Sequence, residues 1–250
     1  MFPILNLGPL AIQAPGLIIL VGIYLSMLVV EKQSKYFKIN SNNLTNLIFI
    51  YLAASLIIAR IAYFSKFPTL LADNPLSLFS LNPNLFDFGS GLVLSILVIY
   101  IFIQKKKINL AELLDALIFP LLVFLIFFFL AQLSSGNLFG KPSNFPWSVY
   151  LWGTTRHPLQ IYYILGVLMI LLITFKEIRS RTIPGFLFLR SITLLSFLAV
   201  FLDFFNGNPQ NTIGNINLIQ IIAWIVLLVS VIVNLLIQKK VDSNQANVAD

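Results

Sequence analysis

Long apolar runs alternate with short polar breaks along almost the whole chain. A bilayer core about 30 Å thick needs roughly 20 apolar residues in one helix, and most runs have about this length. Barrel strands would instead alternate in segments of roughly 10 residues. The pattern predicts an all-α, polytopic membrane protein with about seven transmembrane helices. The predicted spans are approximately Leu10–Val30, Leu44–Phe64, Phe88–Ile103, Leu113–Leu133, Pro158–Phe175, Pro184–Asp203 and Asn217–Gln238.

Composition supports the same class. Of 250 residues, 58% are hydrophobic and only 10% are charged, whereas soluble domains have about a quarter charged residues. We expect one seven-helix domain over residues 1–240, followed by a short polar cytoplasmic tail at 241–250. The absence of cysteine excludes disulfides, thiolate metal sites and a cysteine nucleophile. No nucleotide loop or metal-ligand cluster is found, so no cofactor and no metal is expected.

Lys and Arg residues gather in alternate polar breaks, which sets the predicted orientation. Cytoplasmic loops hold the excess of these residues, so the pattern predicts an N-out/C-in protein. The charge is then explained by topology and by contacts with anionic lipids, and nucleic-acid binding is not expected. The larger set comprises Lys32, Lys35, Lys38, Lys105, Lys106, Lys107, Lys176, Arg179, Arg181, Lys239 and Lys240, and the opposite set only Lys66, Lys141 and Arg156.

Two long loops on the predicted outer face, 65–87 and 134–157, are rich in Pro and aromatic residues. Amphipathic aromatic side chains prefer the headgroup zone. One interpretation is that these loops lie flat on the outer leaflet as anchors. The other is that they cover a lateral opening through which lipids enter, and the two are compatible.

The segment from Arg156 to Tyr163 points most directly to chemistry. Pro158 fits the first turn of a helix, so Arg156 and His157 would lie just ahead of free backbone N–H groups and the positive end of the helix dipole. Such an arrangement binds phosphate. The alternative is an interfacial helix start at which Arg156 snorkels to the headgroups.

This segment, Arg-His-Pro-Leu-Gln-Ile-Tyr-Tyr, resembles the Arg-His-Pro-Ser-Gln-Leu-Tyr-Glu motif of the bacterial prolipoprotein diacylglyceryl transferase family. Weaker similarities follow the family's order along nearly the whole chain. They lie at Leu7–Ile12, Ala59–Tyr63, Ala72–Leu76, Ser135–Lys141, Phe201–Phe205 and Gln220. The resemblance implies a seven-span protein of the bacterial plasma (inner) membrane. It implies transfer of diacylglycerol from phosphatidylglycerol to the cysteine of a lipoprotein precursor.

The resemblance also suggests site residues. His157, the only histidine and so the only side chain whose ordinary pKa lies near neutrality, and Asp203 are the catalytic candidates. The candidates for substrate binding are Arg60, Arg156, Gln160, Asn137, Gly140 and Gln132. Asp87 is a further possible base, but a carboxylate at a helix end more often caps the helix.

Several family positions are substituted here. By ungapped counting, two arginines of the family fall on Phe129 and near Ala199, its third-helix histidine on Gly89, and its glutamate on Tyr163. Arginine pairs two phosphate oxygens at once, so such losses would slow turnover. Three hypotheses therefore remain: an active divergent transferase, a catalytically degenerate relative that binds phospholipid or a partner membrane protein without turnover, and a transporter. The last is disfavoured because no acid, histidine or paired charge lies at mid-membrane to couple ions.

Overall fold

The computed structural model describes residues 4–7, 10–80, 82–181, 183–207, 212–213 and 216–249. Gly8 and Pro9 of the first family-like motif, and Asp250 of the predicted tail, lie outside these residues. The chain divides into two compact units, which are described separately. The first unit comprises Met1–Tyr36 and Leu114–Asp250, and the second comprises Phe37–Leu113. A single domain over 1–240 stays a prediction.

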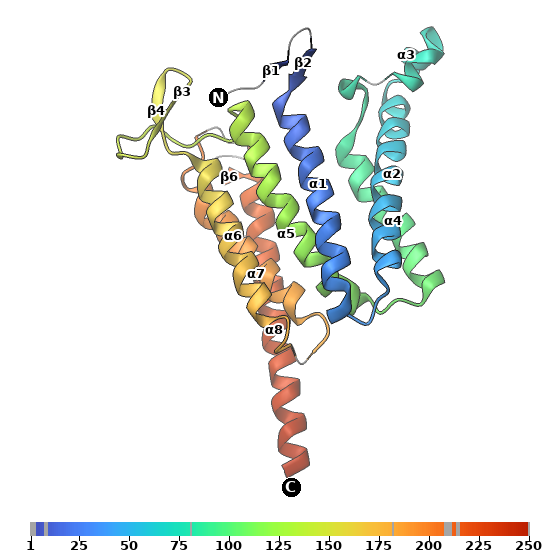
Figure 1. The fold of residues 1–250 in the computed structure, drawn as a ribbon, viewed down its shortest axis with the longest axis vertical. Coiled ribbons are helices and arrows are strands. Elements are labelled where there is room, and N and C mark those ends of the chain that lie inside the picture. Colours follow the sequence, from blue (N-terminus) through green and yellow to red (C-terminus); the bar gives the residue numbers. More distant parts are fainter. Residues whose placement is uncertain are drawn as a thin grey trace. The chain divides into compact units, whose positions relative to one another are not determined.

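Within the described part of the chain, 7 helices are long and apolar enough to cross a membrane, which confirms the predicted all-α membrane class (Figure 1). Because Leu10–Gln13 form a strand, the first helix begins at Ala14 and not at Leu10. The seven helices are α1 (Ala14–Gln33), α2 (Ser41–Lys66), α4 (Phe88–Lys106), α5 (Leu110–Ser135), α6 (Leu159–Glu177), α7 (Phe186–Asp203) and α8 (Leu218–Ala249).

The second unit is built on the pair α2 and α4. A Cβ atom on Gly91 would lie 2.4 Å from the Ser55 carbonyl oxygen and 2.6 Å from the Ala59 Cβ, so only glycine permits this close approach. The connection between the two helices contains the short helices α3 (Pro68–Asp73), η2 (Pro75–Phe79) and η3 (Pro83–Leu85). Asp87 caps α4 by accepting a hydrogen bond from the Ser90 N–H at 3.2 Å, as its position at a helix end suggested.

In the first unit, a buried carboxylate joins α5 to the start of α7. Asp115 on α5 is fully buried and accepts from Arg181 at 2.7 Å. It also accepts from the backbone N–H of Gly185 at 2.8 Å and of Phe188 at 2.9 Å. Asp115 therefore satisfies N–H groups at the first turn of α7 that have no partner within that helix.

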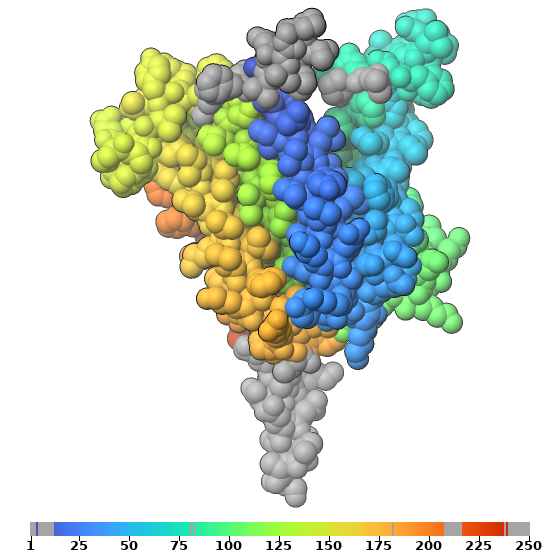
Figure 2. Space-filling view, in the orientation of Figure 1, coloured from blue at the N-terminus to red at the C-terminus, as the bar shows by residue number. Residues whose placement is uncertain are grey.

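Three short hairpins accompany the helices in the described ranges: β1 (Ile4–Leu7) with β2 (Leu10–Gln13), β3 (Val149–Leu151) with β4 (Thr154–Arg156), and β5 (Thr212–Ile213) with β6 (Ile216–Asn217). The β3–β4 hairpin turns at Trp152 and Gly153, both with positive φ, as a type I′ turn requires. Its side chains are largely exposed, and the yellow segment that contains it stands out beyond α6 (Figure 2). The sequence predicted a loop here and gave no sign of paired strands.

Candidate functional site

Three segments from two connections of the first unit, α5–α6 and α7–α8, are bonded to one another at one end of its helices. The Gly140 N–H donates to the His157 carbonyl at 3.1 Å, and the His157 N–H donates to the Lys141 carbonyl at 3.1 Å. The Lys141 N–H donates to the Phe205 carbonyl at 2.8 Å. These bonds bring together residues that lie far apart in the sequence. We call residues 136–143, 154–158 and 203–207 the loop cluster.

Two glycines make the loop cluster possible. A Cβ on Gly140 would lie 2.6 Å from both the Cβ and the carbonyl oxygen of His157. A Cβ on Gly207 would lie 2.3 Å from the Gly140 carbonyl oxygen. Gly140 is thus placed against the candidate His157, where its role is to let two backbones approach.

Arg156 ends strand β4 and is half-buried in the loop cluster. Its Nε donates to the Leu151 carbonyl at 3.2 Å and its Nη1 to the Gly140 carbonyl at 3.4 Å. The guanidinium lies 4.7 Å from the centre of the Phe139 ring. These bonds use two of the five N–H donors of arginine and fix the plane of the group. The arginine is oriented by backbone, which the sequence did not predict.

His157 is also half-buried, and aromatic rings surround it. Its Nδ1 lies 3.1 Å from the Tyr162 hydroxyl oxygen. The ring centroids of Phe145 and Phe205 lie 5.5 Å and 5.2 Å from that of the imidazole. The N–H groups of Leu159 and Ile161 bond to the carbonyls of His157 and Pro158, so part of the predicted phosphate cradle is already bonded within the chain.

Gln160 lies under the loop cluster and is 1% exposed. Its Nε2 donates to the Asn137 carbonyl at 2.6 Å, and the Asn137 N–H donates to the Gln132 carbonyl at 3.1 Å. These three predicted substrate-binding residues thus bond to one another and join the C-terminal end of α5 to the first turn of α6. Their backbone and amide contacts hold the connection that leads to Gly140.

Asp203, the last residue of α7, lies at the same end of the first unit. Its Oδ1 accepts from Asn206 Nδ2 at 3.1 Å and from Asn217 Nδ2 at 2.9 Å. Both asparagines are buried, and sequence reasoning did not identify either. Asn206 follows the aspartate by three residues, a spacing at a helix end that suggests a polar contact. The loop cluster therefore contains a half-buried carboxylate held by two amides.

Arg60 belongs to the second unit and is 6% exposed. It donates to the carbonyls of Leu78 at 3.0 Å, Leu85 at 3.3 Å, Ser80 at 2.6 Å and also Ser77. Its guanidinium therefore organises the connection between α3 and α4. The expectation that Arg60 binds the same headgroup as Arg156 stays a prediction.

Asp87, in the same unit, forms an ion pair with Lys66. This contact, together with hydrogen bonds from the Ser90 backbone and side chain, lowers the pKa of Asp87 from 3.8 to about 2. Asp87 is therefore a poor proton acceptor at neutral pH, and its contacts are those of a helix cap.

Apolar groups occupy the positions at which the family-like motifs would have arginine. The Phe129 ring stacks on that of Tyr163, with 4.4 Å between centroids and 10° between planes. Tyr163 itself stands where the motif has glutamate, so two charged positions are replaced by one pair of stacked rings. The cationic side chains of the loop cluster are Lys141 and Arg156.

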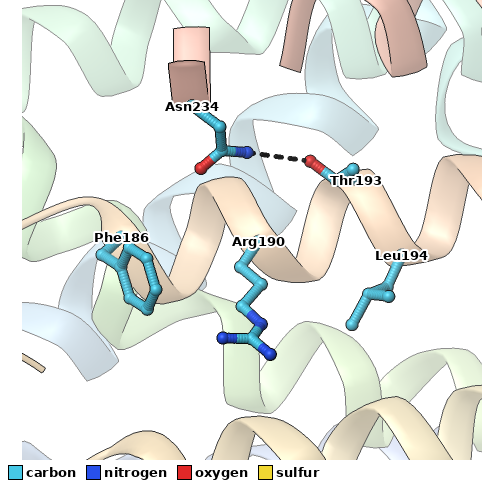
Figure 3. A pocket seen from close by; sticks show the side chains of 5 residues that line it. All are labelled: Phe186, Arg190, Thr193, Leu194 and Asn234. Carbon is cyan, nitrogen blue, oxygen red and sulfur yellow. Dashed lines mark hydrogen bonds between the residues drawn. The ribbon is translucent and has the colours of Figure 1, made fainter. Parts of the chain in front are cut away.

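A separate pocket lies near the opposite end of α7 (Figure 3). Its volume is about 220 Å³, below the roughly 300–1,000 Å³ of typical ligand cavities. Asn234 donates to Thr193 at 3.2 Å, and Arg190 points to the other side of α7, with Nη1 3.0 Å from Glu177 Oε1. Arg190 is 13 residues from Asp203, about 20 Å along the helix. This pocket is distinct from the loop cluster. Its lining residues are Phe186, Arg190, Thr193, Leu194 and Asn234.

Comparison with known proteins gives one family. The family model described as prolipoprotein diacylglyceryl transferase matches residues 3–236. A phosphatidylglycerol–prolipoprotein diacylglyceryl transferase of Clostridioides difficile (strain 630) is 24% identical over 232 residues, 92% of each chain. A protein of the same name from Bordetella parapertussis is 28% identical over 223 residues, covering 84% of this chain and 83% of that one. One from Polynucleobacter necessarius is 33% identical over 141 residues, 53% of each chain.

Proposed function

This chain belongs to the prolipoprotein diacylglyceryl transferase family, and we propose that its loop cluster is the site at which phosphatidylglycerol meets a lipoprotein precursor. Membership and the seven apolar helices make it a multi-pass protein of the bacterial inner membrane. The family match and the named relatives also favour the transferase over the alternative of a degenerate, lipid-binding relative.

The reaction exchanges one bond for another at a glycerol carbon. The acceptor cysteine sulfur forms a bond with the diacylglyceryl carbon that bears the phosphate ester. The bond between that carbon and the ester oxygen breaks, and glycerol phosphate leaves with the electron pair. The thiol proton goes to a base before or during attack. The site must therefore bind a phosphate, stabilise charge on the leaving group and accept a proton.

The loop cluster contains groups for all three tasks. Arg156 is a planar cation whose orientation is fixed by two carbonyls, which suits a phosphate with two oxygens to pair. The His157 imidazole and the Asp203 carboxylate are the candidate proton acceptors. Phe145 and Phe205 contact the half-buried histidine ring and reduce its exposure to water, which strengthens these charge interactions.

The remaining candidates hold this arrangement in place. Gln160, Asn137 and Gln132 fix the connection after α5, and Gly140 lets that connection approach His157. We assign Arg60 the same kind of role in the second unit, where it holds the connection before α4.

We further propose that the loop cluster faces the outside of the cell. Its end of the first unit contains Lys141 and Arg156, whereas Lys32, Lys35, Lys176, Arg179 and Arg181 lie in the breaks at the other end of that unit.

The observation that supports the proposal most strongly is the set of backbone bonds joining Gly140, His157, Lys141 and Phe205. These bonds gather three family-like motifs into one place. The test is rescue of cells depleted of their own diacylglyceryl transferase. We expect the wild-type chain to restore lipoprotein maturation and Arg156→Ala to lose it, since a buried charged hydrogen bond contributes several kcal/mol to a transition state, about a hundredfold or more in rate.

Arg179→Ala is the matched control. Arg179 is exposed and follows α6, at the end of that helix away from the loop cluster, so its loss should leave rescue unchanged. Full rescue by Arg156→Ala at equal expression would refute the site. Failure of the wild-type chain to rescue would refute the transferase function.

A further inference from the structure

His157 is the end of a chain of hydrogen bonds that the transferase reaction by itself does not explain. The Trp147 Nε1 donates to the Tyr162 hydroxyl oxygen at 2.7 Å, and that oxygen lies 3.1 Å from His157 Nδ1. Both lengths are those of ordinary hydrogen bonds. Trp147 precedes the β3–β4 hairpin and Tyr162 lies in the first turn of α6, so two separate elements bond in series to one imidazole.

The chemistry of the three groups fixes the direction of the first bond and favours one direction for the second. The indole nitrogen of Trp147 is a donor only. The Tyr162 oxygen therefore accepts from Trp147 with one lone pair, and its single hydroxyl proton is available to donate. The group placed to receive it is His157 Nδ1. A neutral imidazole that accepts at Nδ1 has its proton on Nε2.

The surrounding rings hold the imidazole in this position. Phe145 stacks on Trp147 with 5.0 Å between centroids and 7° between planes, and Phe205 meets His157 edge to face at 5.2 Å. Tyr162 is itself in contact with Phe205, at 6.3 Å between ring centroids. Rotation of the imidazole would therefore break the bond to Tyr162 and disturb the packing of several rings.

We infer that Tyr162 and Trp147 are positioning residues that keep His157 as a hydrogen-bond donor through Nε2–H, so that His157 stabilises the phosphate leaving group and does not act as the base. This inference rests on the proposed transferase function. Only an unprotonated ring nitrogen can accept a proton, and in this tautomer that nitrogen is Nδ1, which already accepts a hydrogen bond from Tyr162.

In this assignment the two catalytic candidates have different roles, Asp203 as the proton acceptor and His157 as a hydrogen-bond donor. The thiol proton goes to the Asp203 carboxylate, the sulfur forms its bond to the glycerol carbon, and the phosphate oxygen that takes the electron pair receives the hydrogen bond from His157 Nε2–H. No proton is transferred from His157, so the step leaves its protonation unchanged.

Substitution of His157 by glutamine distinguishes the two possible roles of this residue, hydrogen-bond donor and proton acceptor. The glutamine side-chain nitrogen can occupy a position close to that of imidazole Nε2 and can donate, but it cannot accept a proton at neutral pH. We expect His157→Gln to retain activity within about tenfold of the wild type and His157→Ala to fall at least a further tenfold. An equal loss of activity in both variants, when thermal melting shows that both are folded, would overturn the inference.

The tautomer can be observed directly because the chain has one histidine. Protein labelled with ¹⁵N-histidine, carrying a tag without histidine, gives one imidazole in its NMR spectrum at a pH where the ring is neutral. We expect the proton on Nε2 in the wild type and a mixture of tautomers in Tyr162→Phe. A proton on Nδ1 in the wild type, or a tautomer unchanged in Tyr162→Phe, would overturn the inference.

The matched controls are Tyr150→Phe and Trp152→Phe. Tyr150 is 72% exposed on β3, and Trp152 donates to the Gly136 carbonyl at 3.1 Å, away from Tyr162. Both controls should retain the wild-type tautomer, whereas Trp147→Phe should weaken it. The spectrum needs no turnover, so a chain that shows the Nε2–H tautomer but transfers no diacylglyceryl group would refute the proposed function and not the bonding of His157.

Discussion

At the scale of single residues, hydrogen bonds to backbone carbonyls orient the side chains of Arg60 and Arg156. Arg60 donates to carbonyls 17 to 25 residues away, and Arg156 to one 16 residues away. The sequence predicted both as phosphate-binding cations from their motifs. The sequence could not identify the carbonyl groups that these arginines bond, because those positions depend on how the connection between two helices folds back. The same reason explains why Asn217, 14 residues after Asp203, was missed.

Gly140→Ala tests the close approach of backbones in the loop cluster. The added methyl group would overlap the His157 backbone, which is unable to move aside as a flexible side chain would. We expect a loss of about 1–3 kcal/mol in the free energy of unfolding and at least a tenfold loss of transfer, because His157 is displaced. Thermal melting and an activity assay measure the two effects.

The control is Gly16→Ala, since a Cβ at Gly16 would meet no heavy atom of the described residues within 4 Å beyond its own helix backbone and chain neighbours. It should preserve both stability and activity. Wild-type behaviour of Gly140→Ala would mean that His157 tolerates displacement.

Asp87→Asn tests the cap of α4 through its pH dependence. The pKa of Asp87 is lowered to about 2, so the ionised form stabilises the folded state. This contribution is fully present above the unfolded pKa near 3.8 and is lost as the pH falls through 2. Melting temperatures should therefore be higher for the wild type than for Asp87→Asn above about pH 5 and converge toward pH 2. Asp73→Asn, at the end of α3, is the control. A wild-type advantage that persists unchanged at pH 2 would contradict the assignment.

At the scale of elements, hydrophobic pattern predicted the helices well and their ends less well. The third span was predicted as the short run Phe88–Ile103, but the helix extends to Lys106. It ends there because Lys107 adopts the left-handed conformation. Helix α6 begins at Leu159, directly after Pro158, which the sequence placed in the first turn. The ends are set by caps and turns, whose contacts are not periodic.

Asp115→Asn tests the bond between α5 and α7. The substitution removes the negative charge that faces Arg181 at this buried position and weakens acceptance from two N–H groups of α7. Removing one partner of a buried ion pair costs about 3–5 kcal/mol, so we expect a loss of this size in unfolding titrations in mixed micelles. Glu177→Gln is the control. Its partner Arg190 is 48% exposed, and the loss should stay below about 1 kcal/mol. Equal effects of the two substitutions would show that burial of Asp115 does not matter.

At the scale of the whole molecule, the seven spans and the family were predictable because lipid imposes a length and a polarity on every helix. The orientation and the single domain over 1–240 stay predictions. The absence of cysteine makes the orientation easy to test, because any introduced thiol is unique.

We expect Tyr150→Cys, on the exposed β3 strand, to react with a membrane-impermeant maleimide added to intact spheroplasts. Ser180→Cys, in the break after α6, should react only after lysis. The opposite pattern would reverse the N-out/C-in orientation and place the loop cluster in the cytoplasm.

The most direct measurement of the central claim is mass spectrometry of an acceptor peptide with one cysteine. The purified chain is placed in nanodiscs that contain phosphatidylglycerol, and the Clostridioides difficile relative serves as the positive control. Since the chain has no cysteine, every thiol modified belongs to the peptide. The account predicts a peptide that gains one diacylglyceryl group by a thioether bond, and loss of that product in Arg156→Ala. An unmodified peptide, under conditions in which the relative modifies it, would contradict the account.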